Sequence, residues 1–177
     1  MGARVLRRVT TALLAATLCA SVLRADKLSE LQARFDAESN GVRKAKMLQH
    51  LGDAEFDEAA RAEKASDFNT VDLLMEKYRD NVAAASAALK KEIRDGEHHP
   101  GGYKQLEMHV QKGLRELDQY LLEAPDPFKP PLQLVRQDLL TLDDQLLRIL
   151  FPTHHPAKPD GASPPTLLFE PGPGVQP

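Results

Sequence analysis

LQLVRQDLLTLDDQLLRIL, residues 132–150, is the stretch of the chain that decides its fold class. Its apolar residues recur at alternating steps of three and four, and this spacing puts one continuous apolar stripe on an α-helix. The stripe consists of Leu132, Val135, Leu139, Leu142, Leu146 and Ile149. Further leucines at 134, 140, 147 and 150 widen it. The stretch therefore predicts a helix that is buried on two sides and forms the centre of a bundle.

Four more helical segments precede this one. Pro130 and Pro131 suit the first turn of the last helix, and the rigid connection over residues 125–131 favours an antiparallel neighbour. Gly113 interrupts the apolar stripe of that neighbour and predicts a close contact between helices. The first of the four segments is short and amphipathic, with Leu28, Leu31 and Phe35, and it ends at the turn formed by Ser39, Asn40 and Gly41. The second covers about residues 42–65. The third is capped by Asp67 and has apolar residues from Phe68 to Leu89, and the fourth, the neighbour of the last helix, covers about residues 102–123. We therefore expect an all-α bundle of about five helices over residues 26–151.

Residues 1–25 have the order of a secretory signal peptide. Arg4, Arg7 and Arg8 precede a weakly apolar run, and small residues follow it up to Ala25. The run is shorter than the roughly 20 residues that a transmembrane helix needs. We therefore expect an exported protein, periplasmic or secreted, whose mature chain has no transmembrane segment.

Residues 152–177 have a different composition from the helical part. They hold eight of the thirteen prolines and few charged residues, which predicts a disordered tail rich in proline and glycine. Within the tail, Leu167, Leu168 and Phe169 form an apolar island. This island is a candidate for docking to a partner protein, or for covering part of the chain's own domain.

Composition excludes several classes of function. The only cysteine, Cys19, lies in the expected signal peptide, so the mature chain would have no disulfide, thiolate metal site or cysteine nucleophile. Residues 1–25 hold four arginines and no acid, so the mature chain would carry 19 basic against 26 acidic residues, a formal charge of −7. This acidic balance is unlike that of a nucleic-acid-binding protein.

Two resemblances bear on the fold. Ser66-Asp67-Phe68 at a turn, followed by Val71, Met75 and Tyr78, resembles one tetratricopeptide-like helical hairpin, with Ala59 near the small position of its first helix. No 34-residue period recurs elsewhere, so an ordinary helix pair is the preferred interpretation. The chain as a whole resembles secreted all-helical bacterial proteins. That resemblance implies an exported helical protein and no particular activity.

Motifs for catalysis, metals and cofactors fail on spacing. No glutamate stands three residues before any of the six histidines, so the metal motif of di-iron bundles is absent and we predict no enzyme, metal or cofactor. Asp143 and Asp144 are interpreted as part of a solvated face. The sequence thus favours a non-catalytic interaction or structural module with an unknown protein partner. The alternative is a binder of a small ligand or metal ion in a pocket between helices, lined by His50, Tyr78, Tyr103 and His109.

Overall fold

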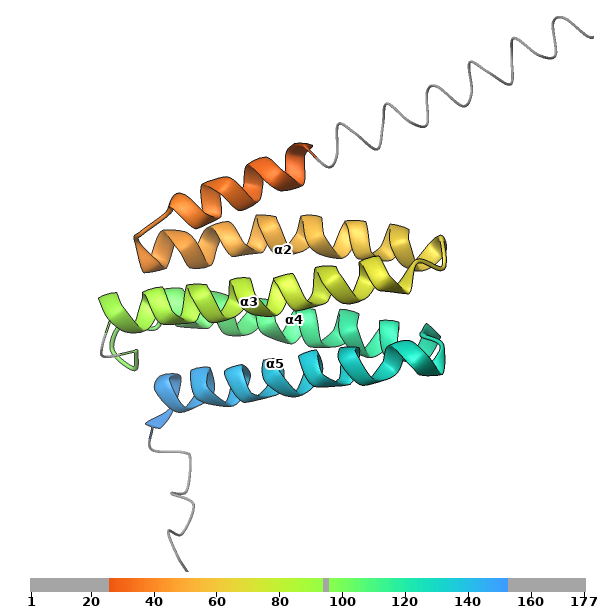
Figure 1. Cartoon of the computed structure of the whole chain (residues 1–177). Helices are drawn as coiled ribbons and strands as arrows, with labels where there is room; N and C mark the ends of the chain where they lie inside the picture. Colours follow the sequence, from red (N-terminus) through yellow and green to blue (C-terminus); the bar gives the residue numbers. More distant parts are fainter. Residues whose placement is uncertain (1–25, 94–95, 153–177) are drawn as a thin grey trace, which may run out of the picture.

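The protein is an up-and-down bundle of α-helices. The computed structural model describes residues 26–93 and 96–152, and no strand occurs among them. A helix over residues 26–37 comes first. It is followed by α2 (Gly41–Lys64), α3 (Phe68–Glu92), α4 (Gly101–Glu123), the short 3₁₀ turn η1 (Asp126–Phe128) and α5 (Lys129–Leu150). Figure 1 shows that successive helices run antiparallel. The all-α class and the five expected helices are confirmed.

The helix boundaries follow local chemistry. The side chain of Asn40 accepts a hydrogen bond from the backbone N–H of Arg43 at the start of α2, and Asp67 does the same for Thr70 at the start of α3. These caps satisfy backbone donors that have no partner inside the helix. Between α2 and α3, Ser66 adopts a left-handed backbone conformation with φ of 58°. The sequence therefore places both boundaries correctly.

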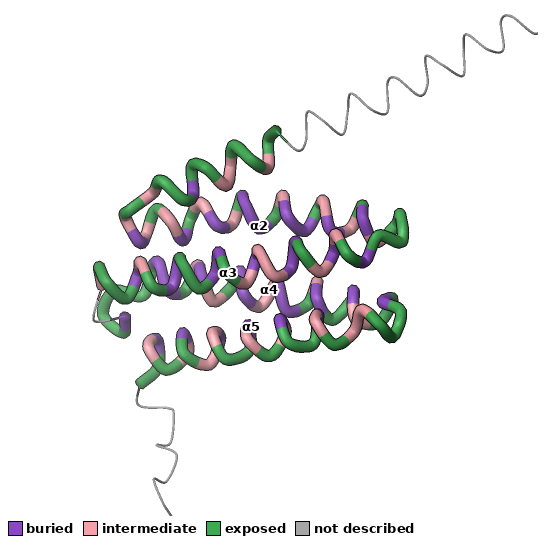
Figure 2. Tube along the Cα trace, viewed as in Figure 1, coloured by how far each residue is buried: buried purple, intermediate pink, exposed green. Residues whose placement is uncertain are grey.

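The hydrophobic core lies between α2, α3, α4 and α5. α3 and α4 occupy the middle of the bundle, because each of them contacts the other three long helices. The helix over residues 26–37 lies along the outer side of α2, on the side away from α5 (Figure 1). Only Phe35 of this first helix is buried, and Figure 2 shows that most of its residues are exposed. Among the described residues, no helix has the length and apolar character needed to cross a membrane.

The expected central position of α5 is wrong. α5 packs on α3 and α4 but makes no contact with α2, so it lies at one side of the bundle. Leu139 is fully buried, whereas Leu134 and Leu140 are 57% and 41% exposed. The extra leucines of the sequence therefore widen the apolar stripe beyond the part of it that the neighbouring helices cover.

Candidate functional site

The structure brings together two of the four side chains expected to line a pocket. The hydroxyl of Tyr78 on α3 lies 2.9 Å from Nδ1 of His109 on α4, and both residues are buried. Tyr103 is also buried, but its hydroxyl donates to the backbone carbonyl of Ile93 at the end of α3. His50 lies exposed on α2. The four side chains therefore do not converge on one place.

Tyr78 and His109 belong to a network of polar side chains that extends from the core to the surface. The Tyr78 hydroxyl also donates to the backbone carbonyl of His109, at 2.9 Å. Nε2 of His109 lies 3.3 Å from Oδ1 of Asp53 on α2, and Nζ of Lys112 lies 2.8 Å from the same oxygen. This polar network thus connects α2, α3 and α4. Its exposed end is the Asp53 and Lys112 ion pair.

Two glycines make room for this pair of rings. A Cβ atom on Gly113 would lie 2.7 Å from the Tyr78 hydroxyl, and one on Gly52 would lie 3.0 Å from the Tyr78 ring and closer still to the His109 ring. Phe56 completes the packing, with its ring centroid 4.7 Å from that of Tyr78. The close contact predicted at Gly113 is present. The space around Tyr78 and His109 is therefore filled by protein atoms.

Burial and charge pairing together set the protonation states in this network. Burial lowers the pKa of His109 below its usual value, although the Asp53 carboxylate opposes that shift. Burial alone would raise the pKa of Asp53, but the hydrogen bond and charge of Lys112 hold it below its usual value. His109 is therefore neutral near pH 7. Because the Tyr78 side chain is fully enclosed, its hydroxyl cannot touch a substrate. We therefore interpret the polar network as a structural link between helices.

A second buried polar group lies between the first helix, α2 and α3. Glu55 on α2 is fully buried, and its Oε1 accepts a hydrogen bond from Nδ2 of Asn81 on α3 at 3.0 Å. The amide of Asn81 also exchanges two hydrogen bonds with the amide of Gln32 on the first helix, at 3.0 and 3.1 Å. Burial raises the pKa of Glu55 to about 8. This group could not be predicted from the sequence, because Glu55 stands among other acidic residues and no spacing sets it apart.

The expectation that Asp143 and Asp144 both lie on a solvated face of α5 is wrong for Asp143. Its side chain is buried, and Oδ2 accepts a hydrogen bond from Nε2 of Gln111 on α4 at 2.8 Å. Burial raises the pKa of Asp143. Only Asp144 fits the expected solvated face, where it forms an ion pair with Arg148. Asp143 instead contributes to the interface between α4 and α5.

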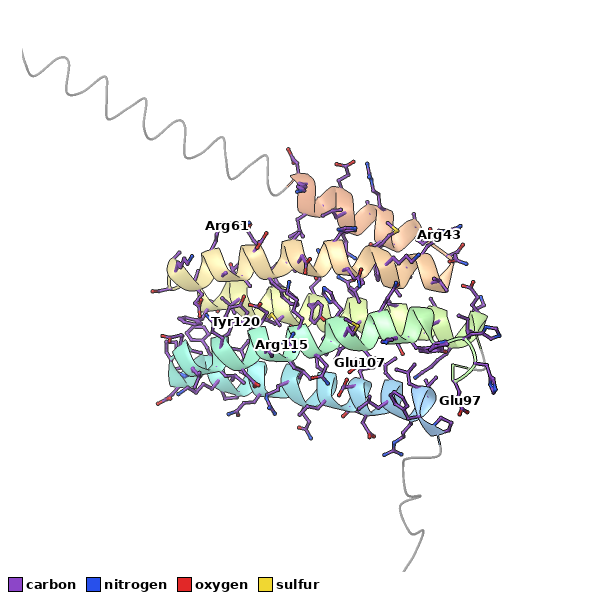
Figure 3. All side chains as sticks on the ribbon, turned by 180° about the vertical axis from the view of Figure 1, so that it is seen from behind. Arg43, Arg61, Glu97, Glu107, Arg115 and Tyr120 are labelled. Atoms are coloured by element: carbon purple, nitrogen blue, oxygen red, sulfur yellow. The ribbon has the colours of Figure 1, made fainter. Side chains whose placement is uncertain are left out.

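No group of three or more histidine, cysteine, aspartate or glutamate side chains in residues 26–93 and 96–152 could hold a metal ion. Charged side chains are spread along the bundle instead. Figure 3 shows Arg43 and Arg61 near opposite ends of α2, and Glu97 at the end of the bundle opposite Tyr120. The Tyr120 hydroxyl is bonded to protein, since it donates to the backbone carbonyl of Phe56.

A shallow groove separates α3 from α5 on the surface. Ala83 and Leu142 supply its apolar part, and Arg79 and Asp138 form an ion pair of 3.1 Å at its edge. Thr141 and Gln145 complete the lining. We call this surface the α3/α5 groove. It joins apolar area to polar groups that remain accessible to another molecule.

The tail residues Leu167, Leu168 and Phe169, expected to dock to a partner or to this domain, lie outside the described residues, as does the expected signal peptide. No family model, curated protein or solved structure matches this chain.

Proposed function

We propose that this chain is an exported, non-catalytic helical module that binds another protein through the α3/α5 groove. The groove carries the proposal, because its apolar part and its polar edge are both accessible. Apolar contacts with a polar rim are the usual composition of a transient protein interface. The partner that fits best is a helical or extended segment that presents small apolar side chains to Ala83 and Leu142.

The buried polar groups support a non-catalytic role. A catalytic base or nucleophile must come within hydrogen-bond distance of its substrate. Tyr78 and His109 have the residue types for such chemistry, but both are buried and bonded to protein groups. Their contribution is to hold α3 against α4, and thereby to fix the bundle on which the groove lies.

A photo-crosslinking amino acid at Ala83 tests the binding surface. Ala84 is the matched control, since it is also exposed on α3 but does not line the groove. We expect a discrete crosslinked product from position 83, formed in the producing cell, and none from position 84. We also expect Ala83→Arg to reduce recovery of that partner while Ala84→Arg does not. Equal crosslinking from both positions would reject the groove as the binding surface.

Export is a separate part of the proposal, and it rests on the order of charged, apolar and small residues at the N-terminus. Cleavage in the region from Ala20 to Ala25 is expected. Mass spectrometry of protein recovered from outside the cytoplasm should then find no residue before about Ser21. Exported material that retains Met1 would contradict cleavage.

A further inference from the structure

The first helix, residues 26–37, packs on the rest of the bundle through few side chains. Phe35 is its only buried side chain, and Leu28 and Leu31 are partly buried against the core. Surface hollows lie beside this helix, and Leu28 lines two of them. Residues 38–40, which are not helical, connect it to α2. Little apolar contact therefore holds the first helix in place.

Amide hydrogen bonds supply the most specific attachment of this helix. Nε2 of Gln32 donates to Oδ1 of Asn81, and Nδ2 of Asn81 donates to Oε1 of Gln32. The same Asn81 nitrogen donates to Oε1 of Glu55. Asn81 thus connects a residue of the first helix to a carboxyl group beneath it. We call Gln32, Asn81 and Glu55 the clasp.

Glu55 lacks the partners that a buried carboxylate needs. Its side chain is fully buried, and its second oxygen, Oε2, has no hydrogen-bond partner. The one donor to the group is a neutral amide. A buried charge is tolerated only when it is paired and hydrogen-bonded. The geometry of the clasp therefore suits a protonated Glu55.

We propose that the clasp holds the first helix in place while Glu55 carries a proton, and that the helix detaches when Glu55 ionises. Ionisation is costly in the closed structure, because the charge would be enclosed with a single neutral donor. Water must therefore reach the carboxylate. The first helix is the element whose removal disrupts the least packing, since the four long helices share the main core.

The charged groups around Glu55 determine the direction of this effect. Lys77 on α3 favours the ionised form, but burial has the larger influence and raises the pKa. The neighbouring Tyr78 has its own pKa raised well above the usual value by burial, so its hydroxyl stays protonated. On the first helix, Asp36 accepts a hydrogen bond from Gln32. On α4, neutral His109 lies beyond Tyr78.

The expected size of the effect follows from proton linkage. In the closed structure the pKa of Glu55 is about 8, and in the open one it returns toward the usual value of 4.5. Between these values the open form binds fewer protons than the closed form. The opening equilibrium should then increase about tenfold for each pH unit between about 5 and 8, and become constant above about 8.

Native-state hydrogen exchange on the full chain, corrected for the pH dependence of intrinsic exchange, tests the proposal. We expect the amides of residues 26–37 to be much less protected than those of α4, and their protection to fall about tenfold per pH unit over that range. In Glu55→Gln the carboxamide can still accept from Asn81 but cannot ionise, so the fall should disappear. A pH-independent protection in the unmodified chain, or an unchanged fall in Glu55→Gln, would overturn the proposal. Protection equal to that of α4 would also overturn it, because the helix would then open only in global unfolding.

A second pair of variants is informative even if Glu55→Gln does not fold. Gln32→Met removes the attachment of the first helix and leaves the contact between Asn81 and Glu55 in place. Arg34→Met is the control, because Arg34 is exposed on the same helix and pairs only with Glu30 of that helix. At pH 5, Gln32→Met should reduce the protection of residues 26–37 at least about tenfold relative to Arg34→Met. Equal protection in the two variants would show that the clasp does not hold the helix.

Discussion

Single residues set the closest packing in this bundle. Gly113 breaks an apolar stripe in the sequence, and this irregularity correctly predicted a close contact. The partner, Tyr78, could not be predicted, because the periodicity of a helix identifies its buried face but not the side chain that faces it. Gly52 was missed altogether, although a Cβ at that position would also displace the two rings.

Gly113→Ala should destabilise the protein by about 1 to 3 kcal/mol, because the added methyl group would force Tyr78 away from His109. Gly101→Ala is the matched control in the same helix. A Cβ there meets nothing within 4 Å, so the change should be neutral or stabilising by up to about 1 kcal/mol. Urea unfolding of both variants gives the comparison. If Gly113→Ala is as stable as Gly101→Ala, the Tyr78 contact does not constrain the fold.

Buried acids were the residues that the sequence concealed. Glu55 and Asp143 both stand beside other acidic residues, in patterns typical of a solvated helix face. Their burial depends on amides contributed by distant segments, Asn81 for Glu55 and Gln111 for Asp143. Local composition cannot reveal such pairs, because each partner is also a common surface residue. The candidate functional groups were therefore much harder to predict than the core.

Whole elements were predicted more reliably than single contacts. The caps at Asn40 and Asp67 and the prolines in the first turn of α5 act locally, so their positions in the sequence fix the helix boundaries. The location of α5 depends instead on how much of its apolar stripe the other helices cover. Leu139 faces the core, whereas Leu134 points away from it.

Leu139→Ala should reduce the free energy of unfolding by about 2 to 5 kcal/mol, because a fully buried leucine leaves a cavity when it is truncated. Leu134→Ala on the same helix is the control, and as a surface substitution it should change stability by no more than about 0.5 kcal/mol. Chemical denaturation measures both. Similar losses at the two positions would mean that α5 is covered on its outer side, for example by a second copy of the chain.

For the whole molecule, two buried titratable groups act on stability from opposite ends of the pH range. Burial lowers the pKa of His109, so the unfolded chain binds a proton there first, and stability falls as the pH drops below about 6.5. Burial raises the pKa of Glu55, so the unfolded chain loses that proton first, and stability falls as the pH rises above about 4.5. Both pKa shifts arise from burial, and both groups are buried because helices from distant parts of the sequence pack together.

The contribution of Glu55 can be isolated by comparing the unmodified chain with Glu55→Gln. The difference in unfolding free energy between them should be constant below about pH 4.5, where Glu55 is protonated in both the folded and unfolded states. From there the unmodified chain should lose about 1.4 kcal/mol of unfolding free energy per pH unit relative to Glu55→Gln. Above about pH 8 it should be constant again, because Glu55 is then ionised in both states. Urea titrations at four or five pH values measure this difference, and His109 cancels from it because both chains contain that residue. A difference that does not vary between pH 5 and 8 would show that Glu55 already reaches water in the folded protein, and that the interior beneath the first helix is not closed.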